Sequence, residues 1–265
     1  MKIIISHDVD HVTVWEHNND LIIPKFIARS LIELRFRHIS ATEIKDRFKS
    51  LLENKWQCLE ELICFDRENQ IFPTFFIAVS KGLGLNYSLE DAKFWIKRIQ
   101  QEGFDVGVHG IAFDDYNCIK KEYNIFKEIS KLDHFGIRIH YIRLMSQTLS
   151  FLSRIGYMFD SSLYKPTNLF KIGNLWEFPL HIMDSYIICK NKRWQNQSFE
   201  KVKDATKQKI DWAHVNRIKY FSILFHDRHF HDGFRLLKDW YLWLITYLKD
   251  NQIKFISYRD AIKEL

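Results

Sequence analysis

Short apolar runs rich in β-branched and aromatic residues recur along the chain, separated by more polar segments. Runs of this kind are typical of buried strands. The pattern predicts strands at Lys2–Ser6, Phe72–Val79, Phe104–Val108, Ile137–Ile142, Tyr157–Phe159, Trp176–Ile182, Phe221–Phe225 and Lys254–Ile256.

The intervening segments have helical period, and two of them begin with a capping-box sequence. Ser40-x-x-Glu43 predicts a helix that continues to about Cys64, and Ser88-x-x-Asp91 predicts one that ends at Gly103. Further helices are expected at Asp115–Leu132, Gln147–Ile155, Phe199–Asn216 and Gly233–Lys249.

Strands and helices thus alternate through most of the chain, which predicts an α/β fold with parallel strands curled into a closed or nearly closed barrel. We expect a single domain over residues 1–265, because no linker or repeat interrupts the pattern. Residues 12–37 do not fit the alternation, since Pro24 lies among apolar residues, and we interpret them as an insertion near the barrel mouth.

Composition narrows the class of protein. The 265 residues are 46% hydrophobic and 15% aromatic, enough for a large core. The net charge of +6 is scattered, and its densest run is Lys190–Arg193, so a nucleic-acid partner is not expected, although peripheral contact with an anionic membrane or glycan remains compatible. Four cysteines without metal spacing indicate reduced thiols, and the absence of a signal peptide or membrane span indicates a cytoplasmic protein of unknown oligomeric state.

Polar residues follow several of the predicted strands, and in a parallel barrel the ends of the strands form the active-site face. Asp8 and Asp10 in "SHDVDH" (6–11) point to the same side of an extended segment, where two carboxylates repel each other unless a cation lies between them. A divalent metal on one aspartate and a basic side chain on the other would leave a general base. An aspartate pair that caps the next helix is an equally weighted alternative.

Other strand ends supply the possible partners. His109 in "VGVHG" (106–110) is a candidate metal ligand, and Gly110 permits close approach or an unusual dihedral. Asp114 is a candidate third ligand, although Asp114 or Asp115 could equally cap the following helix, with the cap slightly favoured for Asp115. Arg138 could pair with Asp8, a role for which Arg143 competes.

His226, in "SILFHDRHFHDG" (222–233), is the histidine at a strand end and suits general-acid catalysis, while His229 and His231 are interpreted as solvated loop residues. His140, two residues after Arg138, is a candidate substrate-binding residue. Tyr141 and Trp176 are candidates for stacking on a sugar, as is Trp15, although most tryptophans are better explained as core.

These motifs resemble those of the NodB-homology polysaccharide deacetylases, also called carbohydrate esterase family 4, over nearly the whole chain. The resemblance is carried by "SHDVDH", "PTFFIAV" (73–79), "VGVHG", "GIRIHY" (136–141), "GYMFDSSL" (156–163), "LWEFPLHIMD" (175–184) and "ILFH" (223–226). "HDVDH" and the Arg-x-His-Tyr variant are similar to a cytoplasmic, WbmS-like branch associated with bacterial O-antigen synthesis.

The resemblance implies a distorted (β/α)7 barrel that binds zinc or another divalent metal and removes an acyl group from an N-acylated amino sugar. It implies that Asp8 is the general base, Asp10 and His109 are metal ligands, Arg138 orients Asp8, and His226 is the general acid. Two residues depart from the family pattern. Phe113 stands where the family has a second histidine, so Asp114, His140, His7 or His11 would have to supply the third ligand, and His140 replaces a proline.

Three functions therefore remain open: a metal-dependent deacetylase acting on a surface polysaccharide or O-antigen precursor, a non-catalytic glycan-binding or assembly protein on the same barrel, and a hydrolase of another small amide. Phe113 favours the second, and the convergence of Asp8, Asp10, His109 and His226 favours the first.

Overall fold

The computed structural model describes residues 1–189 and 194–265, and the basic run Lys190–Arg193 lies outside them. The strands of the described part form one sheet in the order β6-β7-β5-β4-β3-β2-β1-β9-β8. They are β1 (Lys2–Val9), β2 (Thr74–Ile77), β3 (Asp105–Gly110), β4 (Ile137–Ile139), β5 (Phe159–Asp160), β6 (Phe170–Ile172), β7 (Leu175–Glu177), β8 (Leu180–Met183) and β9 (Tyr220–Leu224).

All neighbouring pairs are parallel except β6 and β7. The sheet curls until its two sides meet through one segment, 175–183. The first part of this segment, β7, pairs with β5, and its second part, β8, pairs with β9. Leu180 also forms a parallel bridge with Tyr164 beyond β5 and donates its N–H to the carbonyl of Leu163 at 2.8 Å. The predicted α/β fold, with its strands curled into a distorted barrel, is therefore confirmed.

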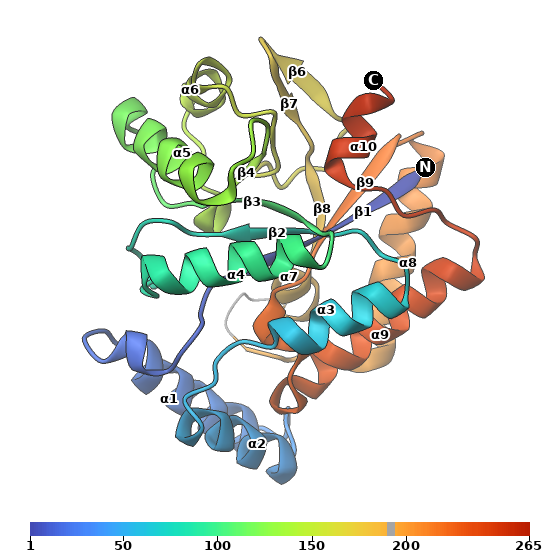
Figure 1. The fold of residues 1–265 in the computed structure, drawn as a ribbon. Coiled ribbons are helices and arrows are strands. Elements are labelled where there is room, and N and C mark those ends of the chain that lie inside the picture. Colours follow the sequence, from blue (N-terminus) through green and yellow to red (C-terminus); the bar gives the residue numbers. More distant parts are fainter. Residues whose placement is uncertain (190–193) are drawn as a thin grey trace.

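Helices surround the curled sheet (Figure 1). They are α1 (Ile22–Arg35), α2 (Ala41–Leu52), α3 (Leu59–Glu68), α4 (Leu89–Gln101), α5 (Tyr116–Ser130), α6 (Thr148–Ile155), α7 (Asp184–Ile188), α8 (Phe199–Val215), α9 (Arg235–Asp250) and α10 (Tyr258–Lys263). Both predicted capping boxes form, at Ser40 with Glu43 and at Ser88 with Asp91. Within the described residues, no helix combines the length and apolarity that a membrane crossing requires.

Four local predictions were wrong. The strand predicted at Trp176–Ile182 is two strands, β7 and β8, separated by residues 178–179. The helix predicted from Ser40 to Cys64 is two helices, α2 and α3, separated by residues 53–58. Residues 254–256 form only an isolated bridge between Phe255 and Ile3, and the strand predicted to run to Ile142 ends at Ile139. Residues 12–37 contain α1, where Pro24 lies in the first turn and needs no hydrogen-bond partner for its nitrogen.

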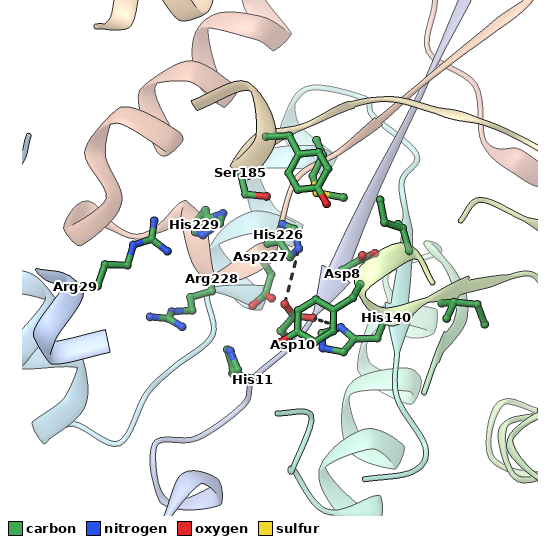
Figure 2. Close-up of a pocket in the computed structure, with 15 residues that line it drawn as sticks. Asp8, Asp10, His11, Arg29, His140, Ser185, His226, Asp227, Arg228 and His229 are labelled. Carbon is green, nitrogen blue, oxygen red and sulfur yellow. Dashed lines mark ion pairs between the residues drawn. The ribbon is translucent and has the colours of Figure 1, made fainter. Parts of the chain in front are cut away.

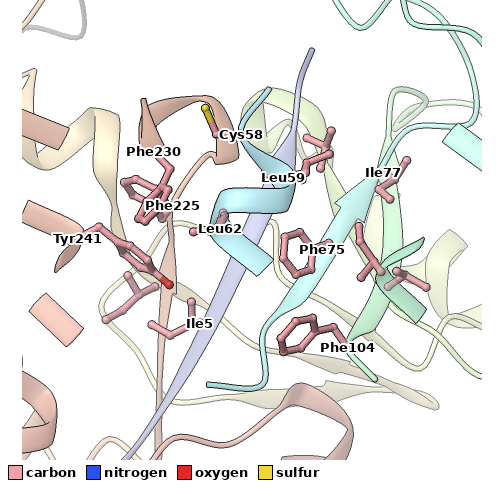
Figure 3. Packing of buried hydrophobic residues seen from close by; sticks show 14 of the residues in the cluster. Ile5, Cys58, Leu59, Leu62, Phe75, Ile77, Phe104, Phe225, Phe230 and Tyr241 are labelled. Atoms are coloured by element: carbon pink, nitrogen blue, oxygen red, sulfur yellow. The ribbon is translucent and has the colours of Figure 1, made fainter. Parts of the chain in front are cut away.

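The main core lies between the sheet and the helices on its outer face. Figure 3 shows Leu59 and Leu62 of α3 close to Phe75 of β2 and Phe225 at the end of β9, with Tyr241 of α9 stacked on Phe225 at 4.2 Å between ring centroids. Burial of such large side chains contributes about 1.5–3 kcal/mol each. This packing fixes the carboxyl ends of β1, β3, β4 and β9, from which the polar residues described next extend.

Candidate active site

A pocket of about 400 Å³ opens at the carboxyl ends of the strands (Figure 2). Its lining comes from β1 and the residues after it, from the end of β4, from the β8–α7 junction, from the residues after β9, and from Arg29 of α1. Of the site residues expected from sequence, Asp8, Asp10, His140, Tyr141 and His226 line it directly.

Asp8 is buried and held by Arg138. The Arg138 Nη1 donates to Asp8 Oδ1 at 2.8 Å, and its remaining nitrogens donate to the Ser161 carbonyl at 2.9 Å, the Ser161 hydroxyl at 3.0 Å and the Tyr258 hydroxyl at 2.9 Å. The guanidinium also lies 4.4 Å from the centre of the Phe76 ring. Burial disfavours the charge of Arg138, but Asp8, Tyr258 and Asp160 together raise the pKa of the guanidinium. Asp8 therefore stands beside a fixed positive charge.

Asp10 lies in a second group, with His109 and His140. Its Oδ1 is 3.1 Å from His109 Nε2 and 3.5 Å from His140 Nδ1, and the two ring nitrogens are 3.0 Å apart. These three donor atoms lie within 4.8 Å of one another, the spacing that a bound metal ion requires of its ligands.

The far nitrogens of both histidines face carbonyl oxygens, which can only accept hydrogen bonds. His109 Nδ1 donates to the Arg138 carbonyl at 3.0 Å, and His140 Nε2 donates to the Leu83 carbonyl at 3.4 Å. In its neutral form, each ring would therefore turn an unprotonated nitrogen toward the Asp10 carboxylate. Such outer partners fix the orientation of histidine ligands in metal sites, so the residues present fit a divalent cation.

The pKa values of Asp10, His109 and His140 are set by their burial and by the ionisable side chains around them. Burial favours neutral Asp10, yet His140, His109 and His226 hold the pKa of Asp10 well below its usual range. Burial lowers the pKa of His140 to about 4 and keeps this ring neutral. Burial also opposes the charge of His109, but Asp8 and Asp10 raise its pKa. Three acceptor atoms around one point thus require a shared cation, which is a proton or a metal.

The structure does not bring Asp114 into this group. Asp114 is exposed in the loop after β3, and the third donor atom beside Asp10 and His109 belongs to His140. Phe113 turns away from the pocket lining, with Arg143 lying 4.3 Å above its ring. Asp115 caps α5 by accepting from the Cys118 N–H at 2.7 Å, as expected.

His226 follows β9 and is held by Asp184, the first residue of α7. The His226 Nδ1 donates to Asp184 Oδ1 at 2.8 Å, and its backbone N–H donates to Asp184 Oδ2 at 2.8 Å. Burial disfavours the imidazolium, but Asp184, with contributions from Asp10 and Asp8, raises the pKa of His226 to about 10. The Nε2 of His226 faces Asp10 at 3.8 Å (Figure 2).

Sequence reasoning missed Asp184, although it lay in the quoted motif directly after a predicted strand. His229 was also misjudged. It is not a solvated loop residue, because its Nδ1 donates to Asp184 Oδ2 at 2.7 Å and the residue lines the pocket. His231 is not free in solvent either, since its Nδ1 accepts from the Gly233 N–H at 3.0 Å.

The remaining candidates divide between the pocket and other places. Tyr141, with a φ of 59° and an exposed fraction of 64%, stands at the rim. Trp176, on β7, packs against a small buried cluster that includes Phe159 and Tyr258, and it does not line the pocket. Arg143 donates to the carbonyls of His140 at 3.1 Å and Ile111 at 2.8 Å, so Arg138 alone of the two holds Asp8.

A further set of donor atoms, from His11, Glu16 and His17, lies beside the pocket. His17 Nδ1 donates to Asp20 Oδ2 at 2.8 Å, and Glu16 accepts from the backbone N–H groups of Val12 and Thr13. These bonds order the loop after β1.

No family model matches the sequence, and no curated protein matches it either. Solved structures do match the fold. A candidate polysaccharide deacetylase of Mycobacterium smegmatis aligns with 99% of this chain and 89% of its own, at 13% identity and a TM-score of 0.61.

Two further structures align over somewhat less of the chain. A Puue allantoinase covers 77% of this chain and 70% of its own, at 16% identity and a TM-score of 0.58. A polysaccharide deacetylase assigned in Pseudomonas aeruginosa PAO1 covers 78% and 71%, at 14% identity and a TM-score of 0.57. The chain therefore has the NodB-like barrel fold of the polysaccharide deacetylases, the family that its motifs resemble.

Proposed function

We propose that the protein is a metal-dependent amidohydrolase that removes an N-acyl group, most simply acetyl, from an amino sugar of a bacterial surface polysaccharide or O-antigen precursor. The observation that carries this proposal is the meeting of three possible ligand atoms, His109 Nε2, His140 Nδ1 and a carboxylate oxygen of Asp10, within 4.8 Å of one another. Asp8 Oδ2 lies 3.9 Å from His109 Nε2, and His226 Nε2 lies 3.8 Å from Asp10 Oδ2.

In this proposal Asp10, His109 and His140 hold the ion, which is zinc or another divalent cation. His140 is thus assigned as the third ligand in place of Asp114 and in addition to its position on the pocket wall. Such an ion, when bound, polarises the amide carbonyl and makes a bound water more acidic.

The protein groups supply the proton transfers. Asp8, hydrogen-bonded to Arg138, accepts a proton from the attacking water. His226, held by Asp184, donates its proton from Nε2 to the leaving amine nitrogen as the C–N bond breaks. The products are a carboxylic acid and the free amino sugar. Tyr141 at the rim is placed to contact the sugar.

The geometry favours a hydrolase over a non-catalytic binding protein. The reason for the binding alternative was the ligand lost at Phe113, and His140 supplies a third donor atom beside Asp10 and His109. A hydrolase of another small amide remains the second candidate, supported by the likeness in fold to an allantoinase.

Asp8→Asn tests the proposal. Release of acetate from N-acetylated sugars should fall at least about a hundredfold, because the amide cannot accept the water's proton. Zinc content should remain that of the wild type, since Asp8 is outside the proposed ligand set. Wild-type activity on N-acetyl sugars that survives in Asp8→Asn would contradict the assigned base. Activity on small cyclic amides alone would support the second candidate.

A further inference from the structure

A second cavity, of about 210 Å³, adjoins the pocket and shares Arg29, Arg228 and His229 with it. We call it the basic cavity, because its other lining residues include Lys25 and Arg47. In the part of the chain that the structure describes, it is lined by four cationic side chains and by no carboxylate. Figure 2 shows Arg29 and Arg228 on the side of the pocket away from Asp8 and His140.

The cationic side chains that line the basic cavity outnumber the carboxylates that form ion pairs with them. Glu33, buried behind it, pairs with Arg47 at 2.7 Å and with Arg29 at 2.9 Å, so two arginines share one carboxylate. Among the described residues, no carboxylate lies within ion-pair distance of Arg228. A cluster of guanidinium groups of this kind is costly to assemble without an anion.

Two guanidinium nitrogens of this cluster have no hydrogen-bond partner. The Nη2 of Arg47 and the Nε of Arg228 are both buried, and neither meets an acceptor among the described residues. Arg47 itself is 1% exposed. Buried donors of this kind are normally satisfied, so these two nitrogens show that donors outnumber acceptors around the cavity, although neither atom is itself open to it.

Aromatic rings hold Arg228 in place. Its guanidinium lies 4.0 Å from the ring centre of Trp56, 4.6 Å from that of Phe26 and 5.1 Å from that of Phe234. Stacking uses the faces of the guanidinium and leaves its N–H edge for an oxyanion. Burial, together with Arg29 and Arg47, lowers the pKa of Arg228 to about 9, a cost that a bound anion would remove.

We infer that the basic cavity binds an oxyanion of the substrate, a phosphate or a carboxylate, and that the substrate of this site is an anionic acylated amino sugar. The identification of the bound molecule as an acylated sugar rests on the proposed function, whereas the binding of an oxyanion in the basic cavity does not. Arg228 and Arg29 form the border between the two cavities, so an anionic substituent bound there leaves the rest of the sugar in the pocket beside Asp10 and His226.

Titration calorimetry on the full-length protein, loaded with zinc, tests the inference. The probes are N-acetylglucosamine, its 1-phosphate, UDP-N-acetylglucosamine, N-acetylglucosaminuronic acid and inorganic pyrophosphate. We expect at least one anionic sugar to bind at least about tenfold more tightly than the neutral sugar, with an affinity that weakens as salt is raised. Preference for the phosphorylated sugars or for the uronic acid distinguishes the two sources of the oxyanion.

Arg228→Gln should abolish the difference between anionic and neutral sugars, and Arg228→Lys should restore part of it. Arg35→Gln, which removes the same charge from an exposed position on α1, should leave it unchanged. Circular dichroism shows whether each variant is folded. Equal affinity for anionic and neutral sugars, no binding of any anionic probe, or a difference that persists in folded Arg228→Gln overturns the inference. Because hydrolysis is not measured, loss of the proposed activity would not produce any of these results.

Discussion

Asp8 and Asp10 are two residues apart at one strand end, and each carboxylate faces a different set of partners. Asp8 faces a guanidinium that is fixed by three further hydrogen bonds, whereas Asp10 faces three imidazoles. Because the two carboxylates have different partners, the repulsion expected from their spacing is offset. It also gives one carboxylate the surroundings of a base and the other those of a metal ligand.

Asp184 acts through His226, and we expect it to be a positioning residue. Asp184→Asn should lower kcat by at least about tenfold with little change in KM, because the amide cannot orient and charge the imidazole in the same way. In the background of His226→Ala, the same substitution should have almost no further effect on kcat. Steady-state kinetics on the four proteins measures this, and additive losses would show that Asp184 acts independently of His226.

Asp227, beside His226, predicts a pH dependence of stability. Its side chain is fully buried with Oδ1 unpaired among the described residues, and burial raises its pKa to about 8. The folded protein therefore keeps a proton that the unfolded chain releases above about pH 4. Asp227 contributes fully below that pH, and its contribution is lost as the pH rises toward 8.

Asp227→Asn mimics the protonated acid and should remove this loss. Relative to the wild type, its free energy of unfolding should increase between pH 5 and pH 8, by up to about 1.4 kcal/mol per pH unit. Urea denaturation of both proteins at the two pH values measures the difference. A constant difference between variant and wild type would mean that Asp227 is ionised in the folded protein.

Strand β4 and the turn after it carry two residues of the site, and each of them contacts a different aspartate. Arg138 points to Asp8, and His140 points to Asp10, in accord with their spacing of two on an extended segment. The chain leaves the strand at Ile139, and Tyr141 and Ile142 take left-handed φ values of 59° and 48°. The apolar run gave no sign of this turn, so the sequence prediction extended the strand too far.

A substitution at Gly136, directly before β4, tests how closely the chain packs against Phe159 at this point. A Cβ there would overlap the ring of Phe159 on β5, which is 4% exposed and has little room to move. Gly136→Ala should therefore lower the free energy of unfolding by about 1–3 kcal/mol, measured by urea denaturation.

The matched control for this substitution is Gly136→Ala combined with Phe159→Leu. The double variant should be more stable than the sum of the two single losses predicts, because the smaller side chain makes room for the methyl group. Strict additivity would show that the ring is not the obstacle.

Across the whole molecule, strand positions and most helices could be predicted from sequence because apolar runs and capping sequences are local signals. The closure of the barrel was less visible, because it depends on one segment, 175–183, that pairs with β5 and then with β9. The short antiparallel β6 was missed for the same reason. Its residues are not buried, and what makes it a strand is its pairing with β7.

The candidate site was predictable where a residue stood at the end of a strand, as Asp8, Asp10, His109 and His226 do. It was not predictable where several residues of similar type competed. Asp114 and His140 were both available as a third donor, and only the fold shows that one loop points outward and the other turns toward Asp10. Asp184 could have been found, since a carboxylate directly after a strand faces the same rim.

The measurement that bears most directly on the proposed chemistry is the metal content of the purified protein after addition of zinc and dialysis. The wild type is compared with Asp10→Ala, His109→Ala and His140→Ala, and with His17→Ala as a control from the neighbouring group of His11, Glu16 and His17. We predict about one divalent ion that each of the first three substitutions removes and that His17→Ala retains. Wild-type protein that binds no ion, or an ion lost only in His17→Ala, would contradict a metal centre at Asp10, His109 and His140.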